Sequence, residues 1–188
     1  TEKCGERSNP DAVKKLRRAL TGLIAICYNI IRYAEKEIEM LAKFAVTNFR
    51  GFRERIELDL TRHRDYEFNS FAISNGIVKN GIIYGPNGAG KSNFSLAIFD
   101  IVNHLSQKGK DFGYYANFAN AAAADGEVTF EYEFKFGDTV VDYSYAKTNE
   151  GFLCGEVLAV NGVQKFKRTA GKFEIDTDEF PMDEAVGC

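Results

Sequence analysis

The sequence of 188 residues predicts an α/β fold with a mixed sheet, an antiparallel β meander and an N-terminal helix. Three patterns support this class. A short apolar run at residues 81–84 leads into a glycine-rich loop, and residues 93–105 after the loop place apolar side chains on one helical face. Polar and apolar residues alternate from residue 127 onwards, as they do in half-buried strands. Before residue 42, apolar residues recur at helical spacing.

A long helix is expected near the N-terminus. Asn9 is a suitable cap, and Pro10 stands at the first helical position. The apolar residues that follow keep near-helical spacing as far as Leu41. We interpret residues 1–39 as an appended helical segment that packs on the rest of the chain or on a partner.

Two strands are expected next. Residues 43–49 and residues 55–60 each alternate polar and apolar side chains. The residues between them include Gly51 and supply a turn. This pattern predicts an antiparallel hairpin that leads towards the glycine-rich loop.

The glycine-rich loop matches the phosphate-binding pattern G-x-x-x-x-G-K-[ST] without a mismatch. Its glycines let backbone N–H groups point inward, and the helix after it adds the positive end of its dipole. Lys91 is the expected catalytic contact to the β- and γ-phosphate oxygens, and the Ser92 hydroxyl is the expected ligand of Mg²⁺. The alternative is a glycine-rich turn with an incidental lysine. The predicted nucleotide-binding residues are Gly85, Pro86, Asn87, Gly88, Ala89, Gly90, Lys91 and Ser92.

The segment after the predicted helix is irregular and then becomes a β meander. Residues 111–126 are rich in alanine and aromatic residues, without a clear period. Residues 127–136, 140–145, 155–160 and 164–168 follow as strand candidates, with Asn161-Gly162 as a two-residue turn. The stripe formed by Val128, Phe130, Tyr132, Phe134 and Phe136 is expected to lie in the core rather than to bind a ligand.

These elements divide the chain into five expected parts. They are an N-terminal helical segment (1–39), a nucleotide-binding core (40–110), a connecting loop (111–126), an antiparallel β subdomain (127–176) and a tail (177–188).

The composition is that of an ordinary globular protein, with 45% hydrophobic and 27% charged residues. The net charge of −3 gives no separate support for nucleic-acid binding. The four cysteines have no C-x-x-C spacing, which favours reduced thiols and a cytoplasmic location over a disulfide framework. The longest apolar stretch, residues 19–31, is too short and too interrupted for a membrane span.

Two segments together resemble a known family. Residues 43–52, which contain Asn48-Phe49-Arg50, and residues 84–93 resemble the amino-terminal lobe of RecF/SMC/OLD-type ATPases, which are ABC-type P-loop NTPases. Asn87, Asn93 and Arg50 match the more particular positions of that family's motifs. The β meander resembles that of bacterial AAA-type, RecF-like ATPases associated with phage defence.

The resemblance implies a function. It implies binding of ATP with Mg²⁺ and contact of Asn93 and Arg50 with the nucleotide. It also implies a homodimer or hetero-partner that meets the chain at the nucleotide face. Hydrolysis in that family is coupled to DNA transactions or to an effector nuclease.

Hydrolysis itself is left open by the sequence. No convincing signature segment, Walker B strand or switch histidine is present, and Asp176 and Asp178 are weak candidates for a metal-positioning carboxylate. Two alternatives therefore remain beside an ATPase. One is a nucleotide-gated interaction module without turnover, and the other is a small-molecule P-loop kinase.

The remaining candidates have simpler interpretations. Arginines at positions 50, 53, 55, 62 and 64 form a basic stretch with His63, but acidic residues alternate with them, which favours paired side chains on a solvated hairpin. His63 and His104 have no partners at metal-ligand spacing.

Overall fold

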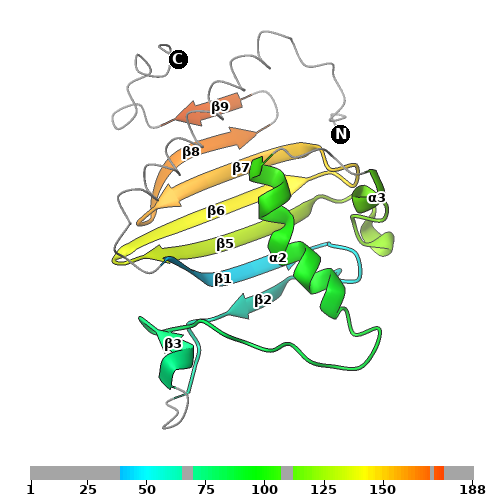
Figure 1. Ribbon diagram of the computed structural model, residues 1–188. Helices are drawn as coiled ribbons and strands as arrows, with labels where there is room; N and C mark the ends of the chain where they lie inside the picture. The colour runs from blue at the N-terminus through cyan, green and yellow to red at the C-terminus, as the bar shows by residue number, and fades with distance from the viewer. Residues whose placement is uncertain (1–38, 65–69, 107–111, 170–171, 176–188) are drawn as a thin grey trace.

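The computed structural model describes residues 39–64, 70–106, 112–169 and 172–175 (Figure 1). Its main feature is a seven-stranded sheet with the order β2-β1-β5-β6-β7-β8-β9, in which every neighbouring pair is antiparallel. The strands are β1 (Glu39–Thr47), β2 (Ile56–Asp59), β5 (Val128–Phe136), β6 (Thr139–Lys147), β7 (Leu153–Val160), β8 (Val163–Thr169) and β9 (Lys172–Ile175).

The N-terminal hairpin and the meander belong to this one sheet. β1 pairs with β2 as the alternation predicted, and it also pairs with β5 on its other side. Phe44 lies opposite Tyr132, and Val46 lies opposite Phe130. The hairpin next to the glycine-rich loop and the meander therefore share a continuous hydrogen-bonded sheet.

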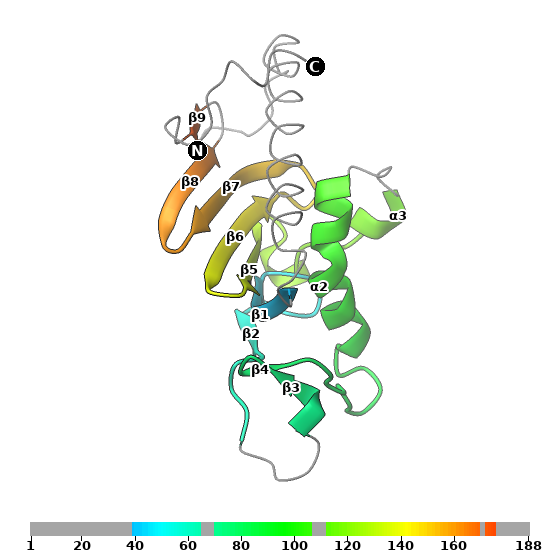
Figure 2. The same cartoon turned by 60° about the vertical axis from the view of Figure 1, so that its left-hand side comes forward.

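One long helix covers one face of the sheet. Helix α2 (Lys91–Ser106) crosses the strands on the face seen in front in Figure 1, and Figure 2 shows it to one side of the sheet. Its apolar face is the one that the sequence predicted, since Ala97 is buried and Phe94, Ile98, Ile101 and Leu105 pack against the core. The shorter elements are η1 (Ser70–Ala72), β3 (Ile73–Ser74), β4 (Ile77–Val78), α3 (Phe112–Tyr115) and η2 (Ala121–Ala123).

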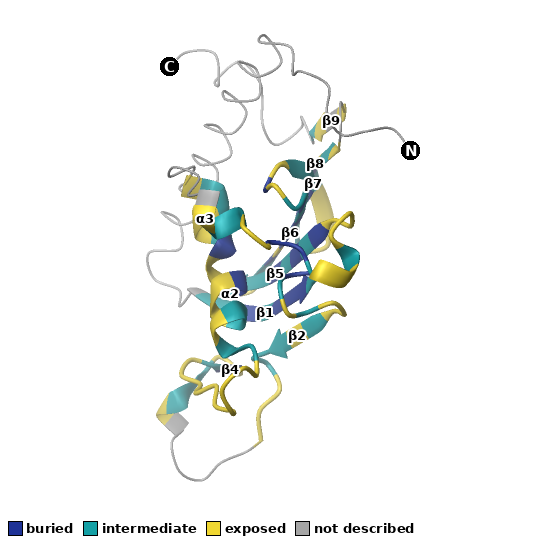
Figure 3. Ribbon diagram, turned by 90° about the vertical axis from the view of Figure 1, so that its right-hand side faces the viewer, coloured by how far each residue is buried: buried dark blue, intermediate teal, exposed yellow. Residues whose placement is uncertain are grey.

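The core lies between α2 and the sheet, where Figure 3 shows the buried segments of the central strands. The predicted aromatic stripe is part of it: Val128, Phe130 and Tyr132 are buried, and Phe134 and Phe136 pack against them. The Tyr132 hydroxyl donates to the Ala97 carbonyl of α2 at 3.1 Å. The prediction that this stripe is core rather than a ligand platform is confirmed.

The predicted fold class is wrong. A P-loop NTPase lobe of the ABC type has a mixed sheet, whereas the described sheet is antiparallel throughout. Residues 81–84, expected as the strand before the loop, form no strand, and Ile82 is 89% exposed and Tyr84 91% exposed. A run that is apolar on both faces forms a strand only between neighbours that pair with it and cover it. The described residues provide no such neighbours.

The helical segment predicted for residues 1–39 overlaps β1 by one residue, because the strand begins at Glu39, and the near-helical spacing that continues as far as Leu41 does not mark a helix there. Met40 and Leu41 lie in β1, where Met40 is opposite Lys135 and Leu41 is opposite Phe134. Three other predictions lie outside the described residues: the helix over residues 1–38, the tail (177–188) and the carboxylates of Asp176 and Asp178. Among the described residues, no helix is long and apolar enough to cross a membrane.

Candidate phosphate-binding site

The glycine-rich loop turns directly into helix α2. Gly88 has φ 81° and Gly90 has φ 91°, a backbone conformation that other residues adopt only with strain. The helix begins at Lys91, and the Phe94 N–H donates to the Gly90 carbonyl at 2.9 Å. The glycines of the motif are therefore required by the shape of this turn.

The loop presents free backbone donors. The Ala89 N–H donates to the Pro86 carbonyl at 3.3 Å. Six further backbone N–H groups of the loop and the first turn of α2 have no acceptor among the residues that the structure describes. These are the N–H groups of Asn87, Gly88, Gly90, Lys91, Ser92 and Asn93. Asn87, Gly88 and Ser92 are exposed, and Gly90, Lys91 and Asn93 are half-buried, so the cluster borders on solvent. A cluster of unpaired N–H groups at a helix N-terminus attracts an anion.

Lys91 adds a positive charge to this cluster. Its Nζ donates to the Gly85 carbonyl at 2.7 Å and to the Pro86 carbonyl at 2.8 Å. An ammonium group has three donors, so the third remains for a further acceptor. The lysine thus bridges the start of the loop and places its charge beside the free N–H groups, while the Ser92 side chain is exposed at the same end of the helix.

The loop rests on the turn between β1 and β2. The Phe52 N–H donates to the Phe49 carbonyl at 2.8 Å, and the Phe52 ring meets the Phe94 ring edge-on at 6.3 Å. A Cβ atom placed on Gly90 would lie 2.9 Å from the Phe52 ring, and one on Gly51 would lie 3.4 Å from Asn93 Nδ2. The two segments that carry the family resemblance are therefore in contact.

Arg50 belongs to this turn but points towards α3. It adopts φ 49°, and its guanidinium lies 5.6 Å from the ring centres of both Phe49 and Tyr114. Its Nη2 donates to the Tyr114 carbonyl at 2.9 Å. Within the described residues, its side chain makes no hydrogen bond or ion pair with residues 85–93. The structure therefore places the Arg50 side chain against Tyr114 and not in the glycine-rich loop.

A buried ion pair lies farther along α2 and was missed by the sequence reasoning. Asp100 is fully buried, and its Oδ2 accepts from Lys147 Nζ at 2.5 Å and from the Tyr145 hydroxyl at 2.8 Å. Its Oδ1 accepts from the Tyr114 hydroxyl at 2.9 Å. Burial, followed by the charge of Asp100, raises the pKa of Tyr114 well above its usual range, so this hydroxyl stays protonated and donates.

A second polar group lies near the end of α2. His104 Nε2 lies 2.8 Å from the Tyr143 hydroxyl and 3.4 Å from Glu156 Oε2, and Arg168 Nη2 donates to the same carboxylate oxygen at 2.7 Å. Burial alone would raise the pKa of Glu156. The contact with His104 and the charge of Arg168 outweigh it, and the pKa lies below its usual value.

The basic stretch is paired with acidic residues in part, as its simpler interpretation predicted, while Arg50 donates instead to the Tyr114 carbonyl. Arg55 contacts Glu57 at 2.6 Å and Glu131 at 2.9 Å, and Arg62 contacts Asp59 at 2.9 Å. Among the described residues there is no group of three or more His, Cys, Asp or Glu side chains that could hold a metal ion.

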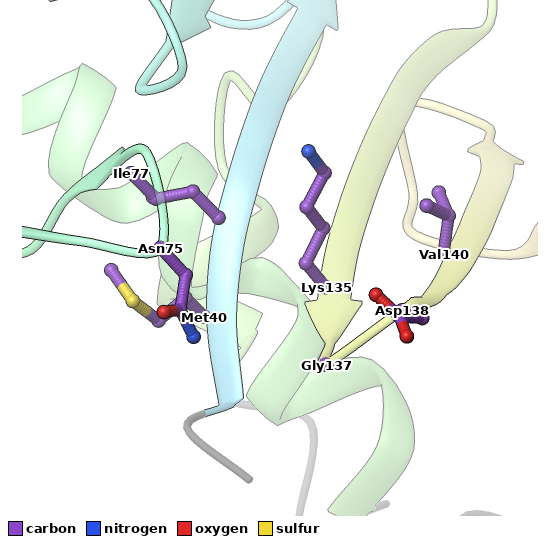
Figure 4. A pocket seen from close by; sticks show the side chains of 7 residues that line it. All are labelled: Met40, Asn75, Ile77, Lys135, Gly137, Asp138 and Val140. Atoms are coloured by element: carbon purple, nitrogen blue, oxygen red, sulfur yellow. The ribbon is translucent and has the colours of Figure 1, made fainter.

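One open hollow of about 530 Å³ lies elsewhere in the described part of the chain. Figure 4 shows that the residues lining it come from β1, the β3–β4 hairpin and the β5–β6 hairpin. It combines one lysine and one carboxylate with apolar atoms, and none of its residues belongs to the glycine-rich loop. The lining residues are Met40, Asn75, Ile77, Lys135, Gly137, Asp138 and Val140.

Comparison of the chain with models of known protein families and with curated protein sequences gives no match.

Proposed function

We propose that the loop of residues 85–92 binds ATP together with Mg²⁺. The observation that carries this proposal is the cluster of free backbone N–H groups at the start of α2, with the Lys91 ammonium beside it. A triphosphate offers several anionic oxygens close together, which is what such a cluster accepts. The match of residues 85–92 to the phosphate-loop pattern at all four of its defined positions supports the same ligand.

The residues have separate roles in this proposal. The N–H groups of Gly88, Gly90 and Lys91 hold phosphate oxygens, and the third donor of the Lys91 ammonium contacts the β- and γ-phosphates. The Ser92 hydroxyl is a ligand of Mg²⁺, an ion that neutralises phosphate charge when it is bound. The Asn93 side chain lies next to Gly51 of the supporting turn.

The resemblance to RecF/SMC/OLD-type ATPases supports a wider role. On that basis, ATP binding or hydrolysis serves DNA transactions or the control of an effector nuclease, and a second copy or a hetero-partner meets the chain at the nucleotide face. The open side of the loop is in keeping with such a partner, because residues 85–89 are exposed. A nucleotide bound there would keep one side free for contact.

The proposal is tested by calorimetry with Mg-ATP on the full chain. We expect one binding site in the wild type and at least a tenfold loss of affinity in Lys91→Ala, because the variant removes the only side-chain cation in the loop. Lys79→Ala is the matched control, since Lys79 is exposed and lies outside the loop. Equal affinity of the wild type and Lys91→Ala would refute the proposal. Turnover measured on the same proteins separates an ATPase from a binding module.

A further inference from the structure

Helix α2 links the phosphate loop to the centre of the core. Its first residue, Lys91, belongs to the loop, and Asp100 lies nine residues later, about 14 Å along the helix axis. Asp100 is 0% exposed, and Lys147 at the end of β6 is 2% exposed. A buried Asp–Lys ion pair thus sits at a point where the rest of the helix face is apolar.

The contacts of this pair are directional. The Asp100 carboxylate accepts three hydrogen bonds of 2.5 to 2.9 Å. Two come from β6, from Lys147 Nζ and the Tyr145 hydroxyl, and one comes from α3, from the Tyr114 hydroxyl. Lys147 Nζ also lies 5.0 Å from the ring centre of Tyr145 and within 5.9 Å of those of Phe130 and Phe118. Rotation of α2 about its axis, or sliding along it, would break these contacts.

A second route leads from the same pair to the loop. Tyr114 donates to Asp100 with its hydroxyl and accepts from Arg50 with its carbonyl. Arg50 lies in the turn whose Phe52 ring contacts Gly90. The loop is therefore connected to Asp100 both through α2 and through Tyr114 and the turn.

Apolar contacts alone would leave the position of the helix less well defined. Leucine-like side chains pack in several related arrangements, whereas a buried carboxylate requires its donors in one arrangement. Buried ion pairs often add little stability compared with an apolar replacement of the same size. The effect to be measured here is therefore conformational specificity, the fixing of α2 in one position.

We propose that Asp100 and Lys147 are positioning residues for the phosphate loop, and that their ion pair fixes α2 where the loop can accept a nucleoside triphosphate. This inference rests on the proposed ATP-binding function of the same loop. Neither residue touches the nucleotide. Each acts through α2, and Tyr114 provides the second connection through Arg50.

The test compares the wild type with the double variant Asp100→Asn/Lys147→Met. The double variant removes both charges and keeps similar volumes, so neither partner is left as an unpaired buried charge. Lys43→Met is the control, because Lys43 forms an ion pair with Glu133 that is partly exposed on the opposite face of the sheet. Hydrogen exchange is measured residue by residue, and Mg-ATP affinity is measured on the same proteins.

We expect the Phe94 amide, which donates to the Gly90 carbonyl, and the amides of the following turn of α2 to exchange at least tenfold faster in the double variant. The amides of β1 and β5 keep their wild-type rates, and Mg-ATP affinity falls at least fivefold. The control variant matches the wild type in both measurements.

Three results would overturn the inference. They are wild-type exchange at Phe94 and in the following turn of α2, faster exchange spread equally over the sheet, and wild-type affinity despite faster exchange in α2. If the wild type itself does not bind Mg-ATP, the proposed function fails. Exchange then still decides whether the pair positions the loop.

Discussion

Loss of the Lys147 charge is the most informative perturbation of the core. In Lys147→Met the Asp100 carboxylate stays fully buried but keeps only the Tyr114 and Tyr145 hydroxyls as donors among the described residues. Removing one partner of a buried ion pair costs about 3–5 kcal/mol, because the other charge is left without compensation. The variant also removes the contact of the ammonium with three aromatic rings.

The assay is urea unfolding followed by circular dichroism. With a slope of about 2 kcal/mol per molar urea, a loss of about 4 kcal/mol lowers the unfolding midpoint by about 2 M. The double variant Asp100→Asn/Lys147→Met should recover most of the loss, since it removes the unpaired charge. Lys43→Met, at a partly exposed ion pair, should cost about 1 kcal/mol or less. A loss below about 1 kcal/mol in Lys147→Met, or no recovery in the double variant, would refute the reasoning.

Two further predictions concern the meander. Gly151 has φ 79°, and a Cβ atom there would lie 2.1 Å from the Tyr115 ring, so Gly151→Ala should lower the free energy of unfolding by about 2–4 kcal/mol. Gly162 has φ 77° and open space around it, so Gly162→Ala should lower the free energy of unfolding by only about 1–2 kcal/mol. Equal losses for the two variants in urea unfolding would contradict this prediction. Because the pKa of Glu156 is lowered in the fold, its contribution is complete above the usual value of 4.5 and is lost as the pH falls through the folded value. The stability difference between the wild type and Glu156→Gln should therefore shrink below about pH 4.5, and a difference independent of pH would argue against the contact.

Local patterns predicted the elements of this fold well. The hairpin of β1 and β2, the meander and the apolar face of α2 follow from period-two and helical spacing, which are properties of neighbouring residues. The glycine-rich loop follows from its motif, because the positive φ values of Gly88 and Gly90 require that residue type. These features need no knowledge of distant contacts.

The fold class depended on long-range pairing and was mispredicted. Residues 81–84 have strand-like composition, but a strand exists only when neighbours pair with it, and within the described residues none does. The pairing of β1 with β5 joins segments about 90 residues apart, which periodicity does not reveal. The same limit applies to Tyr114, which lies in a stretch without a clear period.

The sequence carries a signal that could have predicted the Asp100–Lys147 pair. Asp100 lies three residues after Ala97 on the apolar face of the predicted helix, and Lys147 continues the inward-facing positions of Tyr143 and Tyr145. One carboxylate and one amine, each on an otherwise buried face, predict a buried pair because an unpaired charge there would be costly. The sequence does not show that the two faces meet.

The central claim is that Mg-ATP binds at the free N–H groups of the glycine-rich loop. An amide NMR titration of the ¹⁵N-labelled chain tests it most directly. We predict that Mg-ATP shifts the backbone signals of Gly88, Gly90, Lys91 and Ser92 in a saturable way, and that adenosine without phosphates does not. Saturable shifts confined to other residues, or loop signals that stay unchanged with Mg-ATP, would contradict the claim.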